Sequence, residues 1–246
     1  MLIDGKSTEA SNGATFERRN PVTGDVVTVA PAATLDDVAR AVDSAAQAFP
    51  AWSAKGPSER RAILLKAADA LDAATEEFTT LAMAETGATA PWIGFNVKLA
   101  ANILREAASM TTQMGGEVIP SDKGGSVAMS YRQPVCGLGG MAPWNAPVIR
   151  GVRAIAMPIA CGNTIVLKAS EICPATHGLI GTILQRAGLP DGVLNVVTHS
   201  AEDAPQVVAA LIDHPAVKRI NFTGSTRVGK IIAERAARSL KPVLLE

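Results

Sequence analysis

The sequence carries no excess of charge of either sign, because 23 Lys and Arg residues balance 23 Asp and Glu residues in 246. Nucleic acids and anionic membranes attract proteins first through an excess of Lys and Arg. No stretch of the chain forms a basic stripe that would compensate locally. The composition therefore argues against nucleic acid and membrane surfaces as partners.

Long hydrophobic runs are also missing. The most apolar stretch, residues 148–167, is interrupted by Arg150, Arg153, Pro158 and Asn163. A membrane-spanning helix needs about 20 mostly apolar residues, and the N-terminus lacks the apolar core of a signal peptide. We therefore expect a soluble protein with neither a signal peptide nor a membrane span.

Cysteine is scarce. Cys136, Cys161 and Cys173 are odd in number, widely spaced and set among apolar residues. This usage argues against a disulfide framework and favours a reducing compartment, the cytoplasm. No histidine or cationic cluster stands near any of them in the sequence, so we expect small core residues.

Histidine is equally scarce, and nothing suggests a metal site. The three histidines fall in different segments without the spacing of metal ligands, so structural or solvated roles are expected for His177, His199 and His214. No G-x-S-x-G context surrounds a serine, which argues against a hydrolase triad.

What is present is the composition of a packed globule. Apolar residues make up 48% and charged residues 19% of the chain, which excludes disorder, collagen and coiled coil. At about 150 residues per domain, the length corresponds to one large domain or a domain and a fraction.

The first third of the chain is predicted to be helical after a short extended start. Thr34 and Asp37 have the spacing of a helix N-cap pair, and apolar residues follow at helical intervals. A second helix opens at Pro57, breaks near Asp72 and stops at Gly87. The remaining elements of this part are a third helix over 95–114 and a β-hairpin formed by 117–120 and 127–135.

Short apolar strands alternate with helix-length segments from Cys136 onward. The expected strands are 137–142, 164–168, 193–197, 219–222 and 243–245, with helices opening near Pro147, Pro174, Ala201 and Ser225. This alternation predicts an α/β fold with a doubly wound parallel sheet of Rossmann-like type. Ligands bind such sheets beyond the carboxyl ends of the strands.

Two glycine-rich segments compete as phosphate-binding loops. Residues 137–142 match G-x-G-x-x-G/A, but Pro143 and Pro147 follow and the glycines belong to a strand, so we reject this match. Residues 222–230 are better placed, since a strand precedes them and a helix follows. There Gly224 permits a close approach of a ligand; an ordinary capped helix is the alternative.

Other polar residues also follow predicted strands. Lys168 and Glu171 suit ribose hydroxyls, one donating and one accepting, with solvated strand-end charges as the alternative. The string Pro-Trp-Asn-Ala-Pro at 143–147 is stiff, and the amide of Asn145 suits a developing oxyanion. The alternative for this string is a rigid turn around a buried Trp.

Taken together, these segments resemble one family. The segments that carry the resemblance are 20–24, 137–145, 162–171, 188–195, 222–229 and the final Leu245-Glu246. Their order and spacing resemble the NAD(P)-dependent aldehyde dehydrogenases over the whole chain. The resemblance implies hydride transfer from a covalent thiohemiacetal to a nicotinamide, followed by hydrolysis of a thioester.

The resemblance also implies roles for individual residues. Asn145 would hold the oxyanion, and Glu246 would be the general base, with a pKa raised by partly apolar surroundings. The implied cofactor-binding residues are Trp144, Lys168, Ser170, Glu171, Gly224, Ser225, Thr226, Arg227, Val228 and Gly229. Ala169 departs from the family's usual proline. Because a carboxylate at Glu171 repels a 2′-phosphate, NAD is expected rather than NADP.

The domain organisation follows from the same resemblance. Residues 1–115 and 136–246 would form a discontinuous NAD-binding domain, and the hairpin 116–135 would bridge subunits of a homodimer or tetramer. None of the three cysteines matches the family's nucleophile, which lies beyond the position of Glu246 in a C-terminal catalytic domain. We therefore expect these 246 residues to be inactive alone; a catalytically dead nucleotide-binding or oligomerisation module is the alternative.

The substrate is suggested by one helix face. Ala146, either Ile149 or Arg150, and Arg153 share this face. With Trp92 as a stacking wall they resemble dehydrogenases of hydroxylated aromatic aldehydes such as salicylaldehyde or vanillin. Arg153 also resembles the carboxylate-binding arginine of succinate semialdehyde dehydrogenases. A solvated or interfacial arginine face remains the third possibility.

Overall fold

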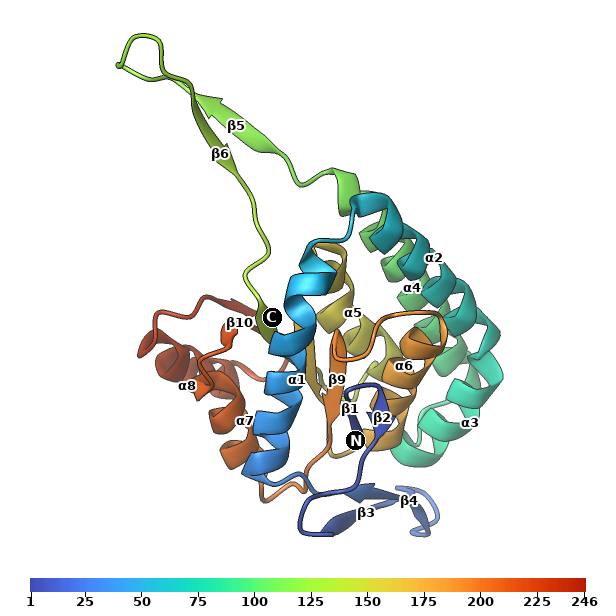
Figure 1. Cartoon of the computed structure of the whole chain (residues 1–246). Helices are drawn as coiled ribbons and strands as arrows, with labels where there is room; N and C mark the ends of the chain where they lie inside the picture. Colours follow the sequence, from blue (N-terminus) through green and yellow to red (C-terminus); the bar gives the residue numbers. More distant parts are fainter.

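The computed structural model describes all residues, Met1–Glu246, and is built on a seven-stranded sheet in the order β11-β10-β7-β8-β9-β1-β2 (Figure 1). The parallel strands are β7 (Gly137–Met141), β8 (Thr164–Lys168), β9 (Leu194–Val197), β10 (Val217–Phe222) and β11 (Val243–Leu245). All five predicted strands are confirmed. Their side chains are buried in β7, β8 and β9, as expected for strands covered on both faces.

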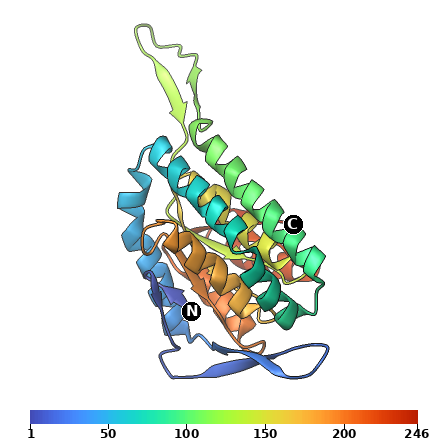
Figure 2. The ribbon, with the colours of Figure 1, turned by 90° about the vertical axis from the view of Figure 1, so that its right-hand side faces the viewer.

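Helices cover both faces of the sheet, which confirms the doubly wound α/β fold. One face carries α1 (Leu35–Ser53), α7 (Ala204–Asp213) and α8 (Thr226–Ala237). The other carries α5 (Pro147–Ala160) and α6 (Pro174–Arg186), with α2 (Pro57–Ala73), α3 (Thr75–Thr86) and α4 (Ala90–Ser109) packed outside them. Figure 2 faces this outer layer, in which α2 and α4 lie side by side.

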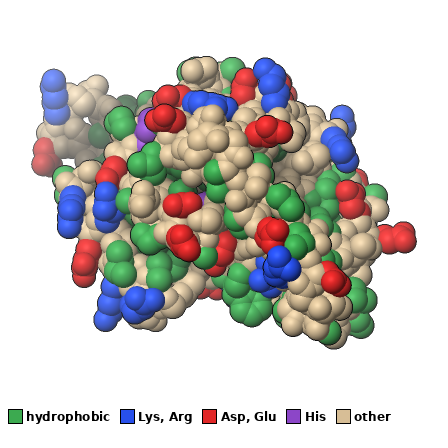
Figure 3. All heavy atoms as spheres, turned by 90° about the horizontal axis from the view of Figure 1, so that it is seen from below, with side chains coloured by type: hydrophobic (Ala, Val, Ile, Leu, Met, Phe, Trp, Pro, Cys, Tyr) green, Lys and Arg blue, Asp and Glu red, His purple; other side chains and the backbone are tan.

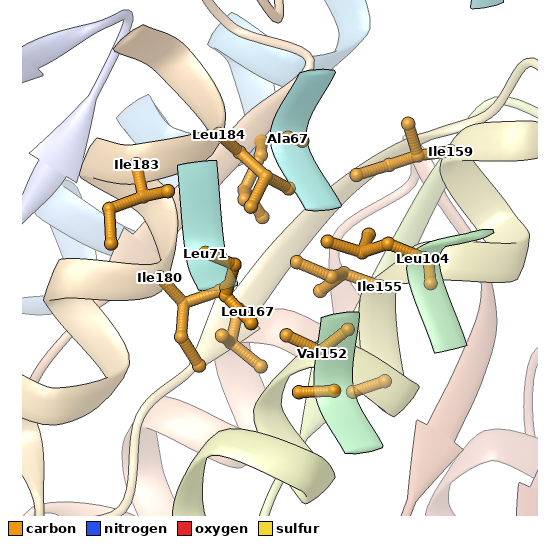
Figure 4. Packing of buried hydrophobic residues seen from close by; sticks show 14 of the residues in the cluster. Ala67, Leu71, Leu104, Val152, Ile155, Ile159, Leu167, Ile180, Ile183 and Leu184 are labelled. Atoms are coloured by element: carbon orange, nitrogen blue, oxygen red, sulfur yellow. The ribbon is translucent and has the colours of Figure 1, made fainter. Parts of the chain in front are cut away.

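The larger core cluster lies between this layer and the sheet. Ile155 of α5 lies beside Leu104 of α4, and Leu167 of β8 packs into the cluster from the side of the sheet (Figure 4). All three side chains are fully buried. Burial of one such side chain contributes about 2 kcal/mol, so this packing holds α5 in a fixed position on the sheet.

The N-terminus corrects one expectation, because the sheet is mixed rather than wholly parallel. β1 (Leu2–Ile3) pairs antiparallel with β9, and β2 (Lys6–Ser7) pairs antiparallel with β1. Strands of two residues are too short to show a periodic pattern, and β1 is fixed by a partner almost two hundred residues away. A separate antiparallel pair, β3 (Thr15–Arg19) and β4 (Val26–Pro31), was also missed.

Helix boundaries follow local signals with one exception. Thr34 and Asp37 form the predicted capping box of α1, and Gly87 ends α3 in the left-handed conformation. The predicted break near Asp72 falls at Ala74, between α2 and α3. The exception is α4, which begins at Ala90 rather than at the predicted residue 95, because Pro91 is tolerated in the first helical turn. The helix ends at Ser109 rather than at the predicted residue 114.

The predicted hairpin is confirmed as β5 (Gly116–Ile119) and β6 (Ala128–Tyr131), which project away from the body of the molecule (Figures 1 and 2). Val118, Val127, Met129 and Tyr131 on this hairpin are at least two-thirds exposed. Among the helices, none combines the length and apolar character that crossing a bilayer requires.

Candidate functional site

The register of the parallel strands brings the candidate segments to one edge of the sheet. Met141 pairs with both Lys168 and Phe222, and Phe222 pairs with Leu245. The segments that follow these four residues therefore leave the sheet side by side. Figure 3 views the molecule from below and shows acidic and basic side chains interspersed over that face.

The rejected glycine pattern is a strand, as predicted. Gly139 and Gly140 lie within β7, which is fully buried. A Cβ atom on Gly139 would lie 3.0 Å from the side chain of Ile220, and one on Gly140 would lie 3.1 Å from that of Ile165. These glycines make room for neighbouring core side chains and do not cradle a phosphate.

The second glycine segment opens α8 beside the end of β11. Ser225 is the N-cap, and its hydroxyl accepts a hydrogen bond from the Val228 N–H at 3.3 Å. The Gly224 N–H donates to the carbonyl of Glu246 at 3.0 Å. A Cβ atom on Gly224 would lie 2.4 Å from the ring of Phe222, so any larger residue here forces the ring or the loop to shift.

A pocket of about 230 Å³ adjoins this helix start. Its lining includes Gly224, Ser225, Thr226 and Gly229 of the predicted set, together with Glu246 and the unpredicted Lys230. Within the predicted segment 224–229, two residues lie outside this pocket, since Arg227 is exposed and Val228 packs against the smaller core cluster. Lys230 is the last residue of the segment 222–230. Its position one turn into the helix is the sequence signal that could have predicted a cation at this pocket.

Lys168 contacts His199, a residue for which the sequence predicts a structural or solvated role. Its Nζ donates to Nε2 of His199 at 2.8 Å. Burial lowers the pKa of Lys168, and the nearby carboxylate of Glu171 opposes that shift. Burial, with a smaller effect of Lys168, lowers the pKa of His199 to about 4, so the imidazole is neutral at physiological pH.

A second histidine connects the loop after β8 with the start of α5. Nδ1 of His177 accepts from the Ser170 N–H, and Nε2 donates to the Pro147 carbonyl, both at 3.1 Å. Burial lowers its pKa to about 4. The predicted cofactor residue Ser170 is thereby tied to the segment that carries Asn145. The expectation of a structural role is met for His177, although this position between two loops was not foreseen.

Cys173 corrects another expectation, because a histidine does lie close to it. Its Sγ is 3.7 Å from Nε2 of His177, a contact that follows from one turn of helix. Burial nevertheless raises the pKa of the Cys173 thiol well above its usual range. The thiol stays protonated, and the predicted role as a core residue is retained.

A residue of α4 holds the backbone of the segment that contains Asn145. The indole Nε1 of Trp92 donates to the backbone carbonyl of Asn145 at 3.2 Å, and the Trp92 ring stacks on Phe95 with centroids 5.6 Å apart. Asn145 is exposed, and so is Trp144, with 45% of its surface free. The alternative of a turn around a buried Trp is therefore wrong.

The predicted substrate helix is divided by burial. Ala146 and Ile149 are buried, whereas Arg150 and Arg153 reach the end of β11. Their Nη1 atoms donate to Oε1 of Glu246 at 2.8 and 2.9 Å. The hydrogen bond from Arg150 is the main cause of a lowered pKa at Glu246, so the expected upward shift is wrong.

A larger pocket of about 770 Å³ lies between the base of the hairpin, α5 and the end of β11. Arg153 and Glu246 line it, together with Met157 and Cys161, whereas Asn145 and Trp92 do not. The two arginines of the predicted substrate site thus contact Glu246, the predicted base. Trp92 contacts Asn145 on the side of α4 instead.

Comparison with known proteins agrees with this geometry. The model of the aldehyde dehydrogenase family matches residues 8–246. A vanillin dehydrogenase of Pseudomonas fluorescens is 63% identical over all of this chain and 51% of its own length. The crystal structure of a salicylaldehyde dehydrogenase from Pseudomonas putida G7, complexed with salicylaldehyde, has a TM-score of 0.97 and 47% identity over 99% of this chain and 51% of that one.

A third similar protein is an NAD-dependent benzaldehyde dehydrogenase from Corynebacterium glutamicum, whose crystal structure has a TM-score of 0.95 and 32% identity over 100% of this chain and 52% of that one. The chain therefore spans about half the length of these relatives. The family match extends over nearly all of the sequence, and the fold agrees along the same residues. The chain belongs to the aldehyde dehydrogenase family.

Proposed function

We propose that this chain is the cofactor-binding part of an NAD-dependent dehydrogenase that oxidises a hydroxylated aromatic aldehyde, such as salicylaldehyde or vanillin, to its carboxylic acid. One observation carries the proposal. The register of β7, β8, β10 and β11 aligns the segments of Asn145, Lys168, Ser225 and Glu246 at one sheet edge.

The residues at this edge suit NAD. Lys168 offers an ammonium and Glu171 a carboxylate to ribose hydroxyls, while the helix start at Gly224–Gly229 suits a pyrophosphate. When bound, NAD supplies the acceptor for a hydride. The carboxylate of Glu171 lies close enough to Lys168 to raise the pKa of that lysine against the effect of burial, and Arg227 is exposed outside the pocket. Because a carboxylate beside the proposed ribose site repels a 2′-phosphate, NAD is favoured over NADP.

The remaining residues suit acyl chemistry at the same edge. Asn145 is exposed, and its side-chain amide would donate to an oxygen that gains negative charge. Trp92 holds the backbone of Asn145 in place. Glu246 serves as the base for water, which requires that its carboxylate leave Arg150 and Arg153.

The nucleophilic cysteine has to come from outside these residues. Cys173 is buried, and burial raises the pKa of both the Cys173 and Cys161 thiols. Cys136 lies just before β7, at the opposite end of the sheet from Asn145. None of the three meets the requirement for an accessible thiolate beside the oxyanion site.

A second candidate substrate is a semialdehyde that bears a carboxylate. The specific observation in its favour is that Arg150 and Arg153 already hold a carboxylate, that of Glu246. The similarity to vanillin and salicylaldehyde dehydrogenases and the stacked pair Trp92–Phe95 favour the aromatic aldehyde.

The test compares kcat/KM for salicylaldehyde, vanillin and succinate semialdehyde in protein expressed from the complete reading frame. We expect the two aromatic aldehydes to be preferred, and Arg153→Ala to leave that preference unchanged. A preference for succinate semialdehyde that Arg153→Ala abolishes would reject the aromatic assignment. Arg186→Ala, an exposed change at the far end of α6, is the matched control.

We further propose that residues 1–115 and 136–246 form the NAD-binding domain and that the hairpin 116–135 bridges subunits of a dimer or tetramer. The support is the row of exposed apolar side chains on β5 and β6. Val127→Lys is expected to lower the molar mass measured by light scattering; an unchanged mass would argue against this bridging role.

A further inference from the structure

Lys168 is held from one side by His199. Lys168 ends β8 and pairs with Val197, so the residue two positions further along, after β9, lies next to it. The distance between Lys168 Nζ and His199 Nε2 is 2.8 Å. The His199 residue is fully buried, so its ring has no freedom to turn away.

Chemistry fixes the direction of both hydrogen bonds of this imidazole. Nδ1 lies 2.6 Å from the Ser200 carbonyl, which only accepts. Nδ1 therefore carries the ring proton, and Nε2 presents a lone pair to an ammonium that only donates. Burial and the charge of Lys168 lower the pKa of His199 to about 4, in agreement with a ring that carries a single proton.

The ammonium of Lys168 is left with unused donors. Its hydrogen bond to His199 is the one hydrogen bond that Nζ makes in the structure, although an ammonium has three N–H groups. Buried or half-buried donors are normally satisfied. Two free donors at the carboxyl end of a strand, with the carboxylate of Glu171 close enough to act on Lys168, thus point to a ligand with hydroxyl acceptors.

We infer that His199 is a positioning residue for the cofactor: it fixes the rotamer of Lys168 so that the two remaining N–H groups meet the hydroxyls of the adenosine ribose. This inference rests on the proposed function. A neutral imidazole suits the task because it orients the ammonium without neutralising it. A carboxylate at position 199 would instead bind Lys168 as an ion pair and weaken its attraction for the ligand.

The inference predicts a loss confined to the adenosine half of NAD. In protein expressed from the complete reading frame, His199→Phe keeps a ring of similar size but removes the acceptor. We expect its dissociation constant for ADP-ribose, measured by calorimetry, to rise on the order of tenfold, which corresponds to one hydrogen bond to a charged group. The KM for NAD rises with it, while kcat at saturating NAD stays within about twofold.

Rescue and control variants separate positioning from folding. His199→Gln restores an acceptor and is expected to recover most of the ADP-ribose affinity. His214→Phe, at the end of α7, is expected to bind as the unmodified protein does. Unfolding temperatures of all variants show whether each is folded.

Two results would overturn the inference in different ways. Unchanged ADP-ribose affinity in folded His199→Phe, or equal losses in the Phe and Gln variants, rejects the role of His199 alone. Failure of the unmodified protein to bind ADP-ribose rejects the proposed function and the inference with it.

Discussion

The carboxylate of Glu85 on α3 accepts hydrogen bonds from both the backbone N–H and the hydroxyl of Thr176 on α6, at 2.9 and 2.6 Å. It also accepts from the Ala175 N–H at 3.0 Å. Glu85 therefore satisfies the free donors at the start of α6, a helix with no acidic residue in its own first turn. Because α6 carries His177, this buried contact supports the loop of Ser170.

Replacement of Glu85 tests this contact. Glu85→Gln keeps the shape of the side chain but turns an amide NH2 toward donors, and we expect the free energy of unfolding to fall by about 2 kcal/mol. Urea denaturation gives the value. Glu77→Gln, an exposed change on the same helix, is expected to have little effect, and equal losses in both variants would contradict the proposed contact.

The helix start at Gly224 offers a second test. Gly224→Ala places a methyl group 2.4 Å from the ring of Phe222, so the ring or the loop between β10 and α8 has to move. We expect NAD affinity to fall at least tenfold. Gly178→Ala is the matched control, because no atom lies within 4 Å of the added group and alanine favours a helix. NAD titration that finds equal affinities for both variants would reject Gly224 as part of the site.

The pairing of Arg150 with Glu246 predicts a shift in pH dependence. The hydrogen bond from Arg150 is the largest cause of the lowered pKa of Glu246. Arg150→Gln is therefore expected to raise that pKa and to move the acidic limb of the kcat profile to higher pH. Arg105→Gln, at a half-buried arginine of α4 that pairs with Asp69 and Asp72 and not with Glu246, serves as the control. An unmoved limb would show that Glu246 does not set it.

The neutral, buried side chain of His177 predicts how the free energy of unfolding depends on pH. The pKa of His177 is about 4 in the folded protein, below its ordinary value of 6.5. Between these values the unfolded chain binds the proton and the folded chain does not. The contribution of His177 to the free energy of unfolding is therefore complete above pH 6.5 and is lost as pH falls toward 4. The loss reaches about 3 kcal/mol for one such group.

His177→Gln tests this dependence, because an amide donates and accepts without titrating. We expect a shallower decline of the unfolding midpoint between pH 6.5 and 4, with part of the slope retained through His199. A slope identical to that of the unmodified protein would show that His177 is protonated in the folded state.

Local signals explain which parts of the fold were predictable. Thr34 and Asp37 are three residues apart, Gly87 ends its own helix, and the apolar runs of β7 to β11 are visible within a few residues. The strand β1 was not predictable, because its pairing of Leu2 with Val196 joins opposite parts of the chain. Two residues contain no period that a sequence pattern can report.

The sequence by itself determined the fold class, the strand ends that carry the candidate site, and the family. Tertiary structure alone decided the environment of each group: the acceptor that His199 presents to Lys168, the link that His177 makes between two loops, and the arginines that lower the pKa of Glu246. The physical reason is that secondary structure follows from neighbours in the chain. A proton, a charge or an unpaired donor responds to whatever lies within a few ångströms, and Arg150 and Glu246 meet across 96 residues.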